Sequence, residues 1–235
     1  MKPDPIDNIL AQAAQRALPP DAGRAAVQRI RSTVLSNLRP VRPLAPLWVF
    51  TLALLALFAI FAVGGALPPG LYGIRVLSQF QRVLIFPVLV AAAWLAAAAC
   101  AREMRPAAGS HLGAIALLLS AGAFPVLFSL LFHDYSTLRF VHQGVPCLIA
   151  GLSVAIPTGL IAALILRRGF VMERGMAGIA AGTLAGLTGL GMLELHCPNL
   201  KAIHVIVWHV AVVIVSGILG FIIGWIADYL GRRGH

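Results

Sequence analysis

Six apolar stretches, each about as long as a membrane-spanning helix, constrain this chain more than any other feature. They cover roughly residues 44–66, 83–101, 112–132, 147–166, 174–193 and 203–227. A helix rises about 1.5 Å per residue, so each stretch can cross a hydrocarbon core of about 30 Å. The apolar residues do not alternate with polar ones, which favours helices over barrel strands. The sequence therefore predicts an all-α integral membrane protein, a six-transmembrane-helix bundle.

The composition and the charge distribution agree with this class. Hydrophobic residues make up 60% of the chain and charged residues 11%, against about 45–50% and about 25% in soluble domains. Most of the 18 Lys and Arg residues lie in the two tails and in the second and fourth loops; the other side carries Arg75, Arg82, Arg139 and Lys201. The positive-inside rule therefore predicts that both termini are cytoplasmic. The net charge of +10 is interpreted as a topology signal and an attraction to the lipid bilayer, not as direct binding of nucleic acid.

Residues 1–43 form a predicted cytoplasmic tail, 44–227 the membrane domain and 228–235 a short C-terminal tail. Because the first span begins only near Leu44, no cleavable signal peptide is expected. Apolar residues recur in the tail at steps of three and four, which predicts a helix over 5–18 with one apolar stripe. The large apolar residues of that stripe are Ile6, Ile9, Leu10 and Leu18.

A second tail helix is expected after Pro19 and Pro20, with Asp21 as its cap. Its apolar face would carry Val27, Ile30, Val34 and Leu38. Amphipathic helices of this kind fit either the groove of a protein partner or the surface of a bilayer. The residues alone leave both interpretations open.

The connection between the last two spans, residues 194–209, gathers the side chains best suited to chemistry. It holds Glu194, three histidines, Trp208 and Cys197, and under the predicted topology it lies at the outer face with Cys147. Both thiols are next to a proline near the expected start of a helix, so the helix dipole is expected to lower the pKa of each. The hypothesis is a disulfide switch or a soft-metal site. Its candidate residues are Cys147, Cys197, His196, His204 and His142.

Helical spacing refines this set. If helix geometry starts near Cys197, His204 lies about 20° from the same face, and Trp208 lines that face too. His209 is expected to point away and to bond a neighbouring helix. Glu194, whose nearest loop partner is Lys201, is expected either to be a solvated interfacial charge or to ligate or tune the cluster. Histidine, tryptophan and cysteine also act as plain packing or interhelical bonding residues in membrane helices. No CxxC or HExxH pattern is present, so the sequence does not support a tight structural zinc site.

Small residues spaced by four mark the last two spans. They are Gly178, Gly182 and Gly186 in span five, and Ser216, Gly220 and Gly224 in span six. Small residues at this spacing allow close helix contact, here tight packing of the last hairpin, with homodimerisation as the less favoured use. The sequence shows no phosphate-cradling loop, serine triad or paired buried carboxylates, so it makes no case for an enzyme.

Several of these features together resemble the NrsF-type membrane anti-sigma factors. They are the helical N-terminal tail, Pro40-Val41-Arg42-Pro43-Leu44, six spans, Cys147 at the head of span four, Leu166-Arg167-Arg168-Gly169, and Leu195-His196-Cys197-Pro198 followed by Trp208-His209. The resemblance implies a regulator in the bacterial inner membrane that holds an extracytoplasmic-function sigma factor through its cytoplasmic tail. It also implies release under heavy-metal or oxidative stress, with the family's paired cysteines at Cys147 and Cys197. No resident cofactor follows from it, only transient binding of a soft or borderline metal ion. The tail here is longer and richer in alanine and arginine than the family pattern.

Two other functions fit a bundle of this kind. A small transporter or metal permease could use Pro87, Pro125 and Pro157 to break helices around a path, but the spans lack Asp or Glu near the midplane for ion coupling. A structural accessory subunit could pack on a larger complex through its glycine faces.

Overall fold

The structure, a computed structural model, describes residues 20–37, 46–105, 111–169 and 171–233, which form helices and no strands. The chain divides into two compact units, Met1–Pro43 and Leu44–His235. In the first unit the described element is α2 (Pro20–Asn37). It begins at Pro20, so Asp21 lies inside the helix and is not its cap as expected. Proline suits a first helical position because its missing donor would be unpaired there. The predicted stripe of Ile6, Ile9, Leu10 and Leu18 lies outside the described residues.

The second unit contains, in its described part, six helices long and apolar enough to cross a membrane. They are α3 (Leu47–Ala66), α5 (Gln79–Glu103), α6 (Leu112–Leu131), α7 (Phe140–Leu166), α8 (Arg174–His196) and a last continuous run. That run consists of α9 (Ala202–His204), the π-helical turn η1 (Val205–His209) and α10 (Val210–Arg233). A short helix, α4 (Tyr72–Val76), joins α3 to α5. The predicted six-helix all-α fold is confirmed.

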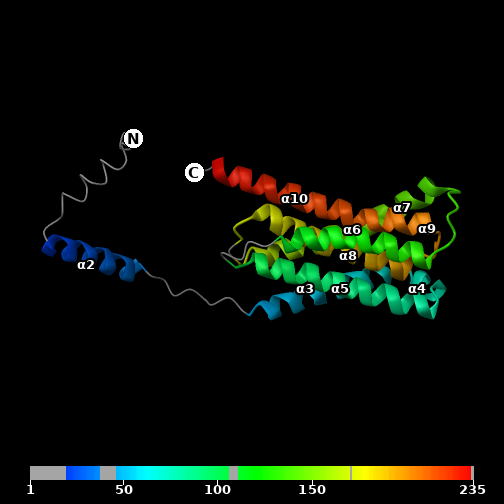
Figure 1. The fold of residues 1–235 in the computed structure, drawn as a ribbon, viewed down its shortest axis with the longest axis horizontal. Coiled ribbons are helices and arrows are strands. Elements are labelled where there is room, and N and C mark those ends of the chain that lie inside the picture. Colours follow the sequence, from blue (N-terminus) through cyan, green and yellow to red (C-terminus); the bar gives the residue numbers. More distant parts are fainter. Residues whose placement is uncertain (1–19, 38–45, 106–110, 170, 234–235) are drawn as a thin grey trace, which may run out of the picture. The chain divides into compact units, whose positions relative to one another are not determined.

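Helix α8 lies at the centre of the bundle (Figure 1). It contacts α3, α5, α6, α7 and α10, and 83% of its apolar window is buried, against 22–39% for the other spans. A helix packed on all sides needs small side chains so that its neighbours can approach. α4 and α9 lie at one end of the bundle, opposite the start of α3 and the end of α10 (Figure 1).

The contact between α8 and α10 depends on glycine. A Cβ atom on Gly178 would overlap the carbonyl oxygen of Gly220, and one on Gly220 would overlap the carbonyl oxygen of Gly178. Gly182 faces the carbonyl group of Ser216 in the same way, and Gly186 lies against the backbone of Val213. The glycine faces of the two helices therefore contact each other within a single copy of the chain.

Two helix starts differ from the predicted ones. α5 begins at Gln79, where the Ser78 side chain and the Gln81 side chain form a reciprocal capping box. α7 begins at Phe140, directly after Arg139 turns the chain with a positive φ of 58°. Pro146 is therefore inside α7 and not at its head, and Cys147 lies about two turns into the helix.

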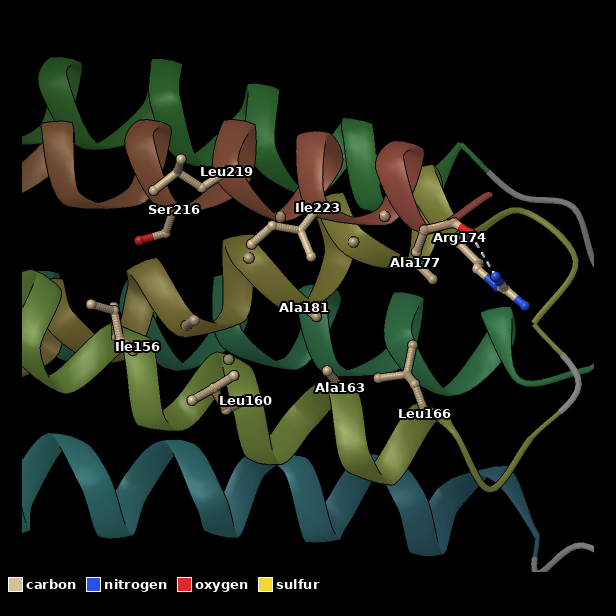
Figure 2. Close-up of a pocket in the computed structure, with 18 of the residues that line it drawn as sticks. Ile156, Leu160, Ala163, Leu166, Arg174, Ala177, Ala181, Ser216, Leu219 and Ile223 are labelled. Carbon is tan, nitrogen blue, oxygen red and sulfur yellow. Dashed lines mark hydrogen bonds between the residues drawn. The ribbon is translucent and has the colours of Figure 1, made fainter. Parts of the chain in front are cut away.

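Helices α7, α8 and α10 enclose an apolar groove of about 730 Å³ near the end of the bundle where α10 finishes. In Figure 2, Leu160 of α7 and Ile223 of α10 lie on opposite sides of Ala181 of α8. Arg174 stands at one end of the groove, with its Nε atom 3.6 Å from Oδ1 of Asp228. Beyond Arg174, α8 presents only alanine and glycine to the groove.

Candidate functional site

Two thiols and two imidazoles converge at the end of the bundle where α4 and α9 lie. Cys147 comes from α7, Cys197 follows α8, His204 ends α9 and His209 ends η1. One ligand atom from each lies within 4.8 Å of the others. The Sγ atoms of Cys147 and Cys197 are 3.6 Å apart, and Nε2 of His204 is 3.6 Å from Sγ of Cys197. These four residues are called the Cys–His cluster below.

The thiols of the cluster are free. Cys147 is half-buried and Cys197 is buried, and neither forms a disulfide. The third cysteine, Cys100, is free and fully buried near the C-terminal end of α5. The cluster therefore holds two reduced sulfur atoms in contact.

His209 joins the cluster, so the prediction that it points away is wrong. Five residues of an α-helix turn by about 500°, which would place His204 and His209 about 140° apart. The chain instead forms the π-turn η1 over Val205–His209, where hydrogen bonds run from residue i to i+5 and each turn holds more residues. The two rings consequently meet, with centroids 5.4 Å apart.

His209 also bonds a neighbouring helix, as expected, and its partner is Glu194. Nδ1 of His209 donates to Oε1 of Glu194 over 2.8 Å, and the two residues are only 1% and 4% exposed. The alternative in which Glu194 is a solvated interfacial charge near Lys201 is therefore wrong. Lys201 Nζ donates instead to the carbonyl oxygen of Leu138 over 3.4 Å. The carboxylate lies in the last turn of α8, and that turn packs against η1.

The other two candidate histidines do not belong to the cluster. His196 ends α8, and its Nδ1 donates to the carbonyl oxygen of Gly70 over 2.8 Å. That bond ties the end of α8 to the loop between α3 and α4. His142 is exposed on the first turns of α7. The cluster thus keeps three of the five candidate residues.

Trp208 lies beside the cluster and not on its face. Its ring packs on Phe140, with centroids 5.2 Å apart. A Cβ atom on Gly144 would overlap the indole, so the ring occupies the space that this glycine leaves on α7. Trp208 therefore packs η1 against the helix that carries Cys147.

The expected lowering of the Cys197 pKa is wrong. The hydrogen bond with Cys147 and burial together raise the pKa of the Cys197 thiol. Cys197 caps the C-terminus of α8, with its amide bonded to the carbonyl of Leu193 over 2.7 Å, and the next helix begins only at Ala202. The favourable field of a helix N-terminus falls off within one turn, so it does not act on this thiol.

Sequence reasoning missed His209 as a member of the cluster. It left open a role of Glu194 in tuning the cluster, but it did not identify His209 as the partner of this carboxylate. A hairpin pattern brings the end of α8 near the start of the last span, and that signal could have paired the two. The donor set that results, two thiols and two imidazoles, suits soft or borderline divalent ions. Adjacent thiols can also oxidise to a disulfide, and both reactions use the same two sulfur atoms.

Comparison with known proteins identifies the family of this chain. No curated protein and no solved structure matches the chain. The family described as "Negative regulator of sigma F" (NrsF) matches residues 35–227. The match covers five spans, most of the sixth and the whole Cys–His cluster, and leaves residues 1–34 and 228–235 outside. The chain therefore belongs to the NrsF family, and this membership implies negative regulation of a sigma factor.

Proposed function

We propose that this protein is a membrane-bound anti-sigma factor of the bacterial inner membrane, with both termini in the cytoplasm. Its N-terminal tail holds an extracytoplasmic-function sigma factor. The Cys–His cluster, at the periplasmic end of the bundle, reacts with a heavy-metal ion or an oxidant, and the sigma factor is then released. Family membership supports the regulatory half of this proposal.

The sensing half of the proposal is supported by one observation. Reactive side chains are buried in contact with one another. His204 and His209 are 2% and 1% exposed, and Cys197 is 6% exposed. Burying polar groups costs free energy unless they are hydrogen-bonded, so their retention at a membrane boundary points to a function. The cluster also draws on three elements, α7, the end of α8 and the α9–η1 segment. A new bond to Cys147, whether from Cys197 or from an ion that Cys197 also binds, therefore links α7 to the hairpin of the last two spans.

The tail supports the binding half. On α2, Val27, Ile30 and Val34 are 64%, 64% and 53% exposed. They follow one another at steps of three and four and so share one face of the helix. An amphipathic helix with an exposed apolar face is suited to the groove of a protein partner.

Coupling between the two ends requires two packings of the bundle that bind the sigma factor with different affinities. Helix α8 is the element suited to this, because it carries Glu194 and precedes Cys197 at one end and contacts every other span along its length. The glycine contacts hold the backbones of α8 and α10 directly against each other. A shift of α8 at the cluster should therefore move α10 as well, because no flexible side chains lie between the two helices at these contacts.

The proposal is tested with the full-length protein in nanodiscs and the extracytoplasmic-function sigma factors of the same cell. One of these sigma factors should bind at submicromolar concentration and dissociate on addition of Cd²⁺ or the thiol oxidant diamide. Cys147→Ser/Cys197→Ser should retain the sigma factor under both treatments. Cys100→Ser, which changes the thiol outside the cluster, is the matched control and should respond like the wild type.

Two results would contradict the proposal in different ways. Binding of none of the sigma factors would reject the anti-sigma assignment. Normal release from the double serine variant would reject the cluster as the sensor and leave the anti-sigma assignment standing.

A further inference from the structure

We infer that Cys147, Cys197, His204 and His209 form a four-ligand tetrahedral site for a divalent ion of the zinc class, meaning Zn²⁺, Cd²⁺ or Co²⁺, and that Glu194 positions His209 for it. The inference rests on the proposed sensing function of the cluster. It adds the ligand set, the geometry and the class of ion.

The ligand atoms are spaced as a tetrahedral ion requires. Zn–S bonds are about 2.3 Å and Zn–N bonds about 2.0–2.1 Å, so a tetrahedral site separates two sulfurs by about 3.8 Å and a sulfur from a nitrogen by about 3.6 Å. The Sγ atoms of Cys147 and Cys197 are 3.6 Å apart, and Sγ of Cys197 is 3.6 Å from Nε2 of His204. The sulfur–nitrogen edge of the tetrahedron therefore already has the required length, and the sulfur–sulfur edge is within about 0.2 Å of it. The remaining separations lie within 4.8 Å.

The hydrogen bond of His209 leaves its other ring nitrogen free to bind an ion. Its Nδ1–H donates to the Glu194 carboxylate, which leaves Nε2 as the nitrogen available to the cluster. Nε2 of His209 is buried without a hydrogen-bond partner among the described residues. A carboxylate bonded to the distal nitrogen is how proteins commonly orient a metal-binding imidazole and increase its basicity. A bound ion would give this nitrogen the partner that it otherwise lacks.

Charge and chemistry select the class of ion. On binding, each thiol loses its proton to solvent and its sulfur bonds the metal, so two protons leave for each divalent ion and no electron is transferred. Two thiolates neutralise the charge of the ion, and the imidazoles donate neutral lone pairs. Sulfur and nitrogen ligands favour zinc-class ions over Mg²⁺ and Ca²⁺, which take oxygen ligands. Four protein ligands also leave no open position, as in sites that hold an ion without catalysis.

Ion binding and disulfide formation exclude each other at this site. A disulfide brings two sulfur atoms to about 2.05 Å, whereas a tetrahedral ion holds them about 3.8 Å apart. An occupied site therefore protects both thiols from oxidation and alkylation, and an oxidised site cannot bind the ion. The cluster can therefore respond to a metal ion or to an oxidant, but not to both at once.

The test titrates reduced full-length protein in detergent with Co²⁺. One equivalent should bind with the intense visible absorption of tetrahedral cobalt and a sulfur-to-cobalt charge-transfer band, and Zn²⁺ or Cd²⁺ should displace it. Cys147→Ser, His204→Ala and His209→Ala should weaken binding at least 100-fold, and Glu194→Gln about 10–100-fold. His142→Ala and His196→Ala, the candidate histidines outside the cluster, should bind like the wild type.

A second measurement needs no substitution in the site. Zn²⁺ should slow the alkylation of Cys147 and Cys197 in the wild-type protein at least tenfold, as followed by mass spectrometry. Weak octahedral cobalt absorption, unchanged alkylation, or wild-type affinity in His209→Ala would each overturn the inference. Release of a sigma factor by diamide from a protein that binds no Co²⁺ would overturn this inference alone. Tetrahedral binding without any release would instead overturn the proposed function.

Discussion

Nδ1 of His209 lies 2.8 Å from Oε1 of Glu194, in the buried space where the last turn of α8 meets η1. The two residues join the halves of the last hairpin at the same point where Cys197 and His204 meet. A carboxylate buried in this way is stable only while a donor faces it, because desolvation of an unpaired charge is costly. The bond therefore has a structural role as well as its role in orienting the imidazole.

Replacing Glu194 should destabilise the bundle in a way that depends on the substitute. Glu194→Ala leaves a buried imidazole unpaired and should lower the free energy of unfolding by about 3–5 kcal/mol. Glu194→Gln keeps an acceptor for Nδ1–H and should cost less. Unfolding of the full-length protein in detergent, followed by circular dichroism, measures both. Lys201→Ala is the control, with an expected change within about 0.5 kcal/mol, and equal losses in all three variants would contradict the pairing.

Replacing a glycine at the contact between α8 and α10 by alanine should destabilise the protein, although alanine has the higher helix propensity. Gly178→Ala places a Cβ atom against the Gly220 carbonyl oxygen and should cost about 1–3 kcal/mol through overpacking. Gly122→Ala in α6 is the matched control, because no atom lies within 4 Å of its added Cβ. There alanine should be neutral or stabilising by up to about 1 kcal/mol. Thermal unfolding in one detergent compares the two, and equal stability would show that α8 and α10 pack less closely than described.

The raised pKa of Cys197 predicts a particular pH profile for alkylation. The first cause of the raised pKa is the hydrogen bond with Cys147, so Cys147→Ala should move the alkylation midpoint of Cys197 to lower pH. The reactive form is the thiolate. Cys197 in the wild type should therefore react more slowly at neutral pH than a free cysteine, and its rate should still be rising at a pH where a free thiol has levelled off. Mass spectrometry of peptides alkylated across a pH series measures this. A midpoint that stays in place or rises in Cys147→Ala would contradict the assigned cause.

The sequence predicted the parts of this structure that follow from hydropathy. Six apolar stretches are enough to predict the six long apolar helices that the described residues form. The Cys147–Cys197 contact also follows, because both residues stand at the same end of the bundle. These features depend on position along a span, which residue order specifies.

Rotation about a helix axis was harder to predict. The α-helical phase placed Trp208 with His204 and turned His209 away, but the π-turn over Val205–His209 brings His209 to His204. A turn with one more residue rotates all the following side chains about the helix axis. The segment contains no proline or glycine from which the wider turn could have been predicted. The pairing of Glu194 with His209 depends on the same rotation, so it could not be foreseen from the nearest charge, Lys201.

The exposed face of α2 gives the last prediction. Val27 and Ile30 are each 64% exposed, and covering a side chain of this size contributes about 1.5–3 kcal/mol, while about 1.4 kcal/mol is a factor of ten in affinity. Val27→Asp/Ile30→Asp in the full-length protein should therefore weaken sigma-factor binding at least tenfold, as measured by interferometry on nanodiscs. Gln28→Asp/Ser32→Asp adds the same charge to another face of the helix and should leave the affinity unchanged. Equal affinity for the two double variants would contradict docking through this face. If α2 instead lies on the bilayer, Val27→Asp/Ile30→Asp should make α2 more susceptible to protease and should leave sigma-factor binding unchanged.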